Sequence, residues 1–507
     1  MMESREQWGT RVGFIFAAVG SAIGLGNIWR FPATAYDSGG GAFFIPYLVA
    51  LLTAGIPLLI MEFTLGHKYR GSAPLTFARI NKGYEWLGWW QVFISFVISV
   101  YYAVIIAWAI SYAIFSFNLA WGEDTEGFLF SEYLHTSAAG EVGSLVPGVL
   151  IPLIIVWLIA LFFIARGVKK GIEIANRIFI PALAIIFLII VIRAITLDGA
   201  GLGLQAFFEP NWNRIMDGEV WVAAYGQIFF SLSIAFAIMI TYSSYLPRKS
   251  DIVNNAFITG FANSSFELLA GIGIFAALGY MALVQGVDVD DVVAGGVGLA
   301  FVVIPQIINE FPFWNEFFGV LFFLSLVLAG LTSLISIIET YIAGLSDKFA
   351  ISRGRAVLFG GGLAAICSLL FATEGGLNFL DAVDYFINQF GIAFAGLIEV
   401  IVIAWFLRKL SELQEHANAI SDIRIGTWWK VCLGIITPII LGYMLFDLFR
   451  VNLMQQFDTE TGNYGGYATD FIIYSGWLIA AAALVVGIFF SFIKWNKASL
   501  EQQKEVD

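Results

Sequence analysis

The sequence predicts an all-α polytopic membrane protein with twelve transmembrane helices. Of the 507 residues, 59% are hydrophobic and only 13% are charged, and the mean hydropathy is +0.83. Soluble domains do not have this composition, and apolar runs of about 20 residues, the length that spans a bilayer, recur from end to end. A transmembrane β-barrel would instead show alternating segments of about ten residues.

The distribution of basic residues predicts the orientation. If the apolar runs are spans, every Lys and Arg lies on one side except Arg30, Arg193, Arg214 and Arg450. Basic loops stay in the cytoplasm, so both termini are expected there, with the chain in a plasma or inner membrane. The first run lacks an A-x-A cleavage site and is expected to remain as a helix. The spans are expected at residues 12–35, 41–66, 86–118, 145–165, 173–196, 220–246, 252–284, 316–346, 354–372, 377–407, 428–449 and 470–493.

Charge, cysteine and histidine content argue against several other classes. The outer loops are acidic, so the net charge of −12 faces largely outward and does not indicate a nucleic-acid partner. Both cysteines lie in apolar runs, which argues against a disulfide or metal framework. An enzyme would need a nucleophile with a base, or clustered His and carboxylates. The three histidines, His67, His135 and His416, are expected in loops far from the polar centres.

The first span contains a break. Gly24 and Gly26 flank one residue, and the polar Asn27 and charged Arg30 follow where a spanning helix should be apolar. In lipid, freed backbone groups are tolerated only where protein or a watery cavity surrounds them. The sequence therefore predicts a broken helix that carries a ligand.

Polar groups inside other spans mark further candidate sites. Glu62 lies deep in span 2 and must be neutralised by protonation or by hydrogen bonds. Asn263 and Glu267 in span 7 are four residues apart and share one helix face. In span 8, the adjacent hydroxyls of Thr332 and Ser333 offer hard oxygen ligands that suit a small alkali cation.

Other features are ambiguous from the residues alone. The paired tyrosines Tyr101 and Tyr102 in span 3 are typical of packing residues. Span 6 has a polar centre but no glycine after Gly226, so its residues predict a continuous helix. Asp384, at the outer end of span 10, would usually be solvated but is a candidate partner for Arg30.

The first ten spans divide into two sets of five. Five is odd, so the second set starts on the opposite side of the membrane, which permits an inverted-topology repeat. The expected parts are a cytoplasmic N-terminal gate segment (1–11), two repeats (12–197 and 198–410), and a last part with two peripheral helices and a cytoplasmic tail (411–507).

Five motifs resemble those of the neurotransmitter:sodium symporters, especially the prokaryotic amino-acid transporters of that family. The resemblance covers spans 1 to 10, and the first-span motif is long and specific. The motifs are Trp8-Gly-Thr-Arg11, Gly20-Ser-Ala-Ile-Gly-Leu-Gly-Asn-Ile-Trp-Arg-Phe-Pro32, Gly39-Gly-Gly-Ala-Phe-Phe-Ile-Pro46, Gln227-Ile-Phe-Phe-Ser-Leu-Ser233 and Ala329-Gly-Leu-Thr-Ser333.

The resemblance implies sodium-coupled uptake of a neutral amino acid by alternating access, without an organic cofactor. It also implies a five-plus-five inverted repeat in which spans 1 and 6 are both unwound. One sodium site would use Ala22, Asn27, Ser231 and Asn263, with the substrate carboxylate as a further ligand. The other would use carbonyl groups of Gly20, Ile23 and Ala329 and the hydroxyls of Thr332 and Ser333.

By the same resemblance, Tyr102 would donate to the substrate carboxylate and Phe230 would close over the substrate. Arg30 and Asp384 would form an outer gate, and Arg5 and Asp347 an inner gate with Trp8 and Tyr245 nearby. The implied substrate residues are Ala22, Gly24, Leu25, Gly26, Ile98, Tyr102, Phe230, Ser231, Ser233, Ala235, Phe236, Ser333 and Ile337.

Departures from the family pattern bear on specificity. Glu267 stands where chloride-dependent animal members have a serine, so chloride independence is expected, with proton release or counter-transport as a further option. Gly24 lacks the aspartate of monoamine transporters, which favours an amino acid. Ala235 and Ile98 are bulkier than their counterparts in the bacterial leucine transporter, which favours small or medium side chains.

Alternatives stay open. Another zwitterion, such as a β-amino acid, γ-aminobutyrate or a betaine, would fit the same chemistry. A channel or a non-transporting sensor with this fold would show damaged sodium ligands or a continuous polar pore, and neither is apparent. The expected partners are the lipid bilayer and a small zwitterionic substrate, with the chain a monomer or weak homodimer.

Overall fold

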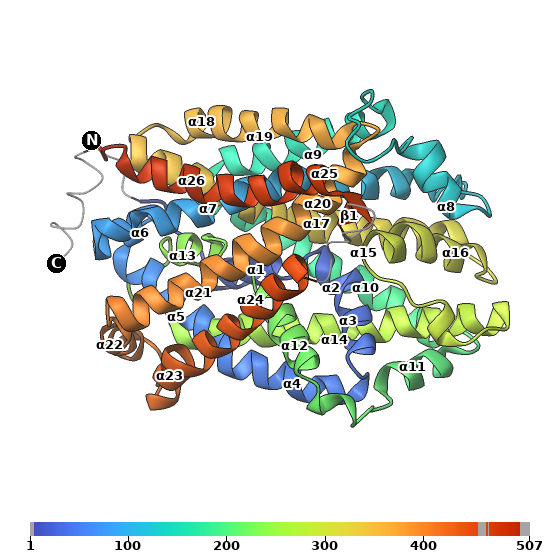
Figure 1. Cartoon of the computed structure of the whole chain (residues 1–507), viewed down its shortest axis with the longest axis horizontal. Helices are drawn as coiled ribbons and strands as arrows, with labels where there is room; N and C mark the ends of the chain where they lie inside the picture. Colours follow the sequence, from blue (N-terminus) through green and yellow to red (C-terminus); the bar gives the residue numbers. More distant parts are fainter. Residues whose placement is uncertain (1–4, 455–462, 465, 497–507) are drawn as a thin grey trace.

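The computed structural model describes residues 5–454, 463–464 and 466–496, and the tail residues 497–507 lie outside the described part. The described chain is almost entirely helical, and its long helices run roughly along one axis (Figure 1). Two short strands, β1 (Asn463–Tyr464) and β2 (Tyr467–Ala468), pair antiparallel.

The helices follow the predicted spans closely. In the first half they are α1 (Arg11–Ala22), α2 (Leu25–Trp29), α3 (Phe31–Asp37), α4 (Phe44–Ala50), α5 (Ile56–Tyr69), α6 (Ala73–Ile80), α7 (Glu85–Phe115), α8 (Thr125–Gly127), α9 (Pro147–Ala165), α10 (Glu173–Ile195), α11 (Ala200–Phe208), α12 (Gly218–Ser231) and α13 (Ile238–Ser243). In the second half they are α14 (Ile252–Gln285), α15 (Gly296–Gly298), α16 (Ile304–Asn309), α17 (Asn315–Phe349), α18 (Arg353–Ala356), α19 (Gly362–Cys367), α20 (Gly376–Phe386), α21 (Ala393–Ile401), α22 (Leu410–Ile420), α23 (Thr427–Val431), α24 (Thr437–Met454), α25 (Thr469–Ile472) and α26 (Leu478–Phe492).

Ten helical segments of the described chain are long and apolar enough to cross a membrane. They match predicted spans 2 to 5 and 7 to 12, whereas spans 1 and 6 are each divided into shorter helices. The ten segments are Gly41–Tyr69, Lys82–Phe115, Pro147–Ala165, Val168–Ile195, Ile252–Gln285, Asn315–Phe349, Arg353–Ala372, Gly376–Phe406, Thr427–Met454 and Thr469–Phe492.

The break in span 1 lies where the glycines predicted it. Helix α1 ends at Ala22, and Ile23 and Gly24 are extended before α2 begins at Leu25. The side-chain oxygen of Asn27 accepts a hydrogen bond of 2.9 Å from the Gly24 amide. One of the donors freed at the break is therefore satisfied inside the protein, as the membrane environment requires.

Span 6 is also broken, so the prediction of a continuous helix from its residues was wrong, and the break implied by the family resemblance is present. Helix α12 ends at Ser231 and α13 begins at Ile238. Between them, Ser233, Ala235 and Ala237 have φ angles of 54°, 63° and 63°. This left-handed region is uncommon for residues other than glycine.

Hydrogen bonds to three neighbouring spans hold the span 6 break. The Glu62 carboxylate accepts a bond of 2.8 Å from the Ala235 amide. The Ser95 hydroxyl donates to the Phe236 carbonyl at 2.6 Å, and the Ser233 hydroxyl donates to the Ser21 carbonyl at 2.9 Å. Tertiary contacts thus replace helical hydrogen bonds that the segment lacks.

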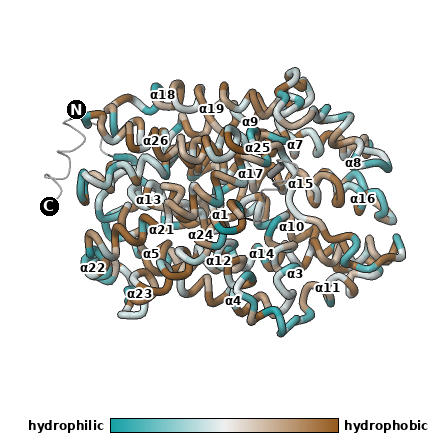
Figure 2. The backbone as a smooth tube through the Cα atoms, viewed as in Figure 1, coloured by the Kyte–Doolittle hydropathy of each residue, from teal (hydrophilic) through white to brown (hydrophobic). Residues whose placement is uncertain are grey.

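The broken spans lie in the interior, and apolar surface faces outward. Helix α1 packs against α10, α14 and α17, and α17 packs along α7. Apolar residues dominate the outer helices, while hydrophilic residues gather mainly at their ends and in the loops (Figure 2). Large apolar side chains such as Leu158, Ile185 and Phe406 are exposed, as expected for a surface that meets lipid.

Two histidines do not lie in loops, contrary to the sequence prediction. His67 belongs to the last turn of α5 and His416 to α22. His67 Nδ1 lies 2.9 Å from His416 Nε2, and His67 Nε2 lies 3.0 Å from the Pro247 carbonyl oxygen. Helix α22 contains no glycine or proline, and α5 continues past Gly66 through His67 to Tyr69.

Candidate functional site

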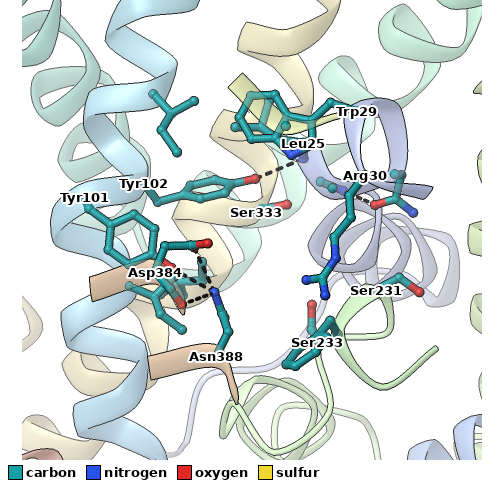
Figure 3. Close-up of a pocket in the computed structure, with 18 of the residues that line it drawn as sticks. Leu25, Trp29, Arg30, Tyr101, Tyr102, Ser231, Ser233, Ser333, Asp384 and Asn388 are labelled. Atoms are coloured by element: carbon teal, nitrogen blue, oxygen red, sulfur yellow. Dashed lines mark hydrogen bonds between the residues drawn. The ribbon is translucent and has the colours of Figure 1, made fainter. Parts of the chain in front are cut away.

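A cavity of about 400 Å³ lies between the two helix breaks. Figure 3 shows its walls: residues of broken span 1 on one side, the span 3 tyrosines on another, and Ser231 and Ser233 from span 6. Every substrate residue implied by the resemblance lines this cavity except Ala235.

Ala235 is fully buried and does not line the cavity. Its amide is bonded to Glu62, in the left-handed part of the break. The expectation that Ala235 adds bulk directly to the substrate wall is therefore not supported, whereas Ile98 does line the wall.

One set of oxygen atoms surrounds Ser333. Its hydroxyl lies 3.3 Å from the carbonyl oxygens of Gly20 and Ser21 and 3.4 Å from that of Ile23. The Thr332 hydroxyl donates to the Ala329 carbonyl at 2.9 Å. All five groups implied for this cation site therefore lie around the junction of span 1 and α17, and these hard oxygen donors suit an alkali cation.

A second set links span 1 to spans 6 and 7. The Asn27 amide donates to Asn263 Oδ1 at 2.8 Å, and the Asn263 amide donates to Ser231 Oγ at 3.0 Å. All three residues are buried. Each amide also carries an oxygen, so this chain of side chains can present oxygen ligands to a cation beside the carbonyl group of Ala22.

Glu267 lies next to this second set and is fully buried. Its Oε1 atom accepts a bond of 2.6 Å from Gln227, and its Oε2 atom accepts a short bond from the Tyr47 hydroxyl. Tyr47 also bonds Ser264 at 2.8 Å. A carboxyl group thus lies among side-chain hydrogen-bond donors that would otherwise suit a bound anion.

At the span 1 break, the cavity wall combines the Tyr102 hydroxyl with free space beside Gly26. The Tyr102 hydroxyl accepts the Leu25 amide hydrogen at 3.2 Å (Figure 3). A Cβ atom on Gly24 would lie 3.1 Å from that hydroxyl and 3.2 Å from Ser333 Oγ, whereas one on Gly26 would meet no atom within 4 Å. Only hydrogen fits comfortably at Gly24, which keeps these two hydroxyls at the cavity wall.

The two residues expected to form the outer gate are apart. Arg30 and Asp384 lie on opposite sides of the cavity (Figure 3), and the ion pairs found among the described residues do not include them. The Arg30 guanidinium carbon lies 5.0 Å from the centre of the Phe230 ring. Asp384 instead accepts from the Asn388 amide at 2.8 Å.

The residues expected to form the inner gate are in contact. Arg5 pairs with Asp347 at 3.1 Å and also donates to the Ser244 hydroxyl at 2.7 Å. The Trp8 indole donates to the Tyr242 carbonyl at 2.8 Å, and the Trp8 amide donates to the Tyr245 carbonyl at 3.1 Å. If these two pairs are the gates, the formed inner pair and the separated outer pair correspond to an outward-facing conformation.

Sequence reasoning missed part of the cavity wall. Tyr385 and Asn388 of span 10 line it, as do Gly296 and Val297 of the short helix α15. The four-residue spacing of Asp384 and Asn388 was a usable signal, because it places both side chains on one helix face. The α15 residues carry no comparable signal.

Comparisons with known proteins place this geometry in a family. A family model described as the sodium:neurotransmitter symporter family matches residues 5–134 and 124–498. The chain belongs to the sodium:neurotransmitter symporter family. This agrees with the resemblance in the motifs, and the relatives are transporters rather than enzymes.

Members of the family are similar over nearly the whole chain. An uncharacterized sodium-dependent transporter of Methanocaldococcus jannaschii is 41% identical over 494 residues, which cover 97% of this chain and 99% of the relative. The human sodium- and chloride-dependent taurine transporter is 30% identical over 528 residues, covering 95% and 83%. A crystal structure of MhsT in complex with L-phenylalanine has a TM-score of 0.75 and 31% identity, and the match covers 88% of this chain and 100% of that one.

Several expectations are thereby established. The chain is a multi-pass membrane protein with the fold of the bacterial transporters of this family, built from helices with discontinuous first and sixth spans. It belongs to a family whose members use sodium to move a small substrate. The residue assignments and the boundaries of the two repeats stay predictions.

Proposed function

We propose that the protein imports a small or medium neutral amino acid together with sodium, by alternating access. The observation that carries this proposal is the convergence of two oxygen-rich sets on one cavity at the two helix breaks. In the proposed arrangement, residues 12–197 and 198–410 are the inverted repeats, and both termini are cytoplasmic.

Two sodium ions are proposed. One would be held by the Ala22 carbonyl with Asn27, Ser231 and Asn263, and the other by the set around Ser333. Both sets include atoms of span 1, and each joins it to a different partner, spans 6 and 7 or α17. Binding of sodium would therefore hold the broken spans together and complete the cavity wall.

An amino-acid substrate fits the polarity of the cavity. The N-terminal end of α2 and the Tyr102 hydroxyl lie where a carboxylate can accept hydrogen bonds. Gly24 supplies no acidic side chain that would pair with the amine of a monoamine, which favours an amino acid. Ile98 and Ile337 line the cavity and offer an apolar surface for a neutral side chain.

The position of Glu267 supports the proposed chloride independence. The carboxylate already accepts hydrogen bonds from Tyr47 and Gln227, beside the oxygen atoms that would hold one sodium ion. It supplies the negative charge that a bound chloride would otherwise supply.

Another zwitterion is the second candidate. The human taurine transporter, 30% identical to this chain, is named for a substrate whose acidic group is not a carboxylate. The same cation sets would serve a β-amino acid, γ-aminobutyrate or a betaine, so only a substrate panel separates these choices.

The test is uptake into proteoliposomes of labelled zwitterions under an inward sodium gradient, and again with potassium replacing sodium. Sodium-dependent accumulation of alanine, glycine or valine is expected. A Thr332→Val variant should lose this accumulation, because the methyl group keeps the shape but removes a cation ligand, while the exposed Glu316→Gln variant should match the wild type.

Other outcomes point elsewhere. Tight binding of aromatic amino acids with no response to alanine, glycine or valine would contradict the proposed side-chain preference. Sodium-dependent binding without accumulation would indicate a sensor. Loss of uptake in chloride-free buffer, with recovery on adding chloride, would contradict chloride independence.

A further inference from the structure

A pair of buried acids lies beside the span 6 break, outside the cavity wall described above. Glu62 of α5 and Glu399 of α21 are 0% and 1% exposed. Glu62 Oε1 accepts from the Ala235 amide at 2.8 Å, and Glu399 Oε2 accepts from the Gln91 amide at 2.7 Å. Each carboxyl group therefore has one oxygen atom in a hydrogen bond.

The remaining oxygen atoms have no donor. Glu62 Oε2, Glu399 Oε1 and Gln91 Oε1 are buried, and no partner is found for them among the described residues. None of the ion pairs in the described part of the chain includes either acid. A buried acceptor without a donor is costly, so the cluster lacks at least one hydrogen that its environment requires.

Glu62 contacts the broken backbone directly, and Glu399 is connected to it through α7. Glu62 bonds the Ala235 amide, and Ser95, one helical turn from Gln91 on α7, bonds the carbonyl of the next residue, Phe236. Glu399 is the charged group found to interact electrostatically with Glu62, whose other partner is that Ala235 amide. For Glu399, the polar partner is Gln91.

Two ionised carboxylates in such a place would repel each other in a medium of low dielectric constant. One proton bound between the two acids removes this repulsion. A protonated carboxyl group becomes a donor. Its O–H can donate to the free oxygen atom of the other acid, so that both formerly unpaired oxygen atoms take part in one hydrogen bond.

We propose that Glu62 and Glu399 bind one shared proton, and that this proton site holds the span 6 break in the outward-facing conformation. Loss of the proton would leave two carboxylates that repel each other near Ala235. This repulsion would push Glu62 away from the Ala235 amide to which it is bonded. Because α13 packs against α5, the inner half of span 6 would be released with it.

The first test is infrared spectroscopy of the purified full-length protein in deuterated buffer, without substrate. A carbonyl stretching band from a protonated, buried carboxyl group is expected at neutral pH in the wild type. It should disappear in both Glu62→Gln and Glu399→Gln, because the introduced amide donates to the remaining carboxylate and makes the proton unnecessary. The Glu316→Gln variant, changed at an exposed position, should keep the band.

Several results would overturn the proposal. Persistence of the wild-type spectrum in both single variants would show that neither acid is protonated, and loss in only one would show that the proton belongs to one acid alone. Carboxylate bands of the pair that respond to sodium but not to pH would show a cation in place of the proton. If neither Gln variant folds, the absence of any protonated carboxyl band in the wild type still refutes the proposal.

The second test measures sodium-dependent substrate binding from neutral to alkaline pH. Once the shared proton is lost, affinity should fall by about tenfold per pH unit for one linked proton. Glu399→Gln should have a flat profile over the same range. An unchanged slope in Glu399→Gln would contradict the link to conformation. The infrared result does not depend on substrate identity, so failure of the proposed transport function would leave it intact.

Discussion

Replacement of Gly24 by alanine tests whether the hydroxyls at the cavity wall hold substrate and sodium together. The added Cβ would lie 3.1 Å from the Tyr102 hydroxyl and 3.2 Å from Ser333 Oγ, so both must move by a few tenths of an ångström. The backbone at Gly24, with φ −116° and ψ −169°, is extended and open to alanine. The effect therefore comes from the side-chain contact alone.

The expected magnitude follows from overpacking. Inserting a methyl group into a closely packed site costs about 1 to 3 kcal/mol, which corresponds to roughly 5- to 150-fold in affinity. Because Ser333 belongs to one of the proposed sodium sites, the loss should appear as a higher sodium concentration for half-maximal binding of labelled substrate. The protein can be assayed in detergent, with sodium titrated at a fixed substrate concentration.

Gly26→Ala is the matched control. It lies two residues away on the same broken span, and its added Cβ would meet no atom within 4 Å. We expect its sodium requirement to change by less than about twofold, or about 0.4 kcal/mol, although a large substrate could bind less well. Equal sodium shifts in both variants, or no shift in Gly24→Ala, would refute the reasoning.

Three further changes have expected outcomes. Tyr102→Phe removes the hydroxyl that bonds the Leu25 amide, and should weaken substrate binding by about 1.5 to 3 kcal/mol, the range for a hydrogen bond to a charged group; unchanged equilibrium binding would contradict the assignment. Asp347→Asn removes the charge that pairs with Arg5 across the inner gate, and at about 1 kcal/mol should raise cytoplasmic-side labelling of the cavity about fivefold; equal labelling in both proteins would exclude a gating role. Burial lowers the pKa of His416 to about 4, so the neutral imidazole stabilises the fold above about pH 6.5 and this contribution is lost as pH falls towards 4. Thermal unfolding should show a drop in melting temperature on acidification that is smaller in His416→Gln, and identical drops would contradict this.

The first broken helix could be predicted from sequence because its cause is local. Gly24 and Gly26 weaken the helix, and Asn27 supplies the side chain that caps the freed Gly24 amide. The number of spans and the membrane class followed from hydropathy, which reflects lipid contact directly. The hydroxyl pair at Thr332 and Ser333 could also be identified from sequence, because adjacent hard oxygen donors are unusual inside an apolar span.

The second broken helix could not be predicted from its own residues. Ser233, Ala235 and Ala237 take left-handed backbone angles that glycine would signal but that these residues do not. Their conformation is imposed by partners such as Glu62, whose position beside span 6 is a product of the fold. The cavity wall contributed by Asn388 depends in the same way on where span 10 packs.

The left-handed residues of span 6 have a consequence for how the chain assembles. Each costs about 1 to 2 kcal/mol relative to helical geometry, and in isolation nothing compensates it. A newly inserted span 6 should therefore enter the bilayer as an unbroken helix. Unwinding becomes favourable only after spans 1, 2 and 3 bring Ser21, Glu62 and Ser95 against it. The transport site would thus be a late product of assembly, absent from any intermediate in which the first helices have not yet packed against the sixth.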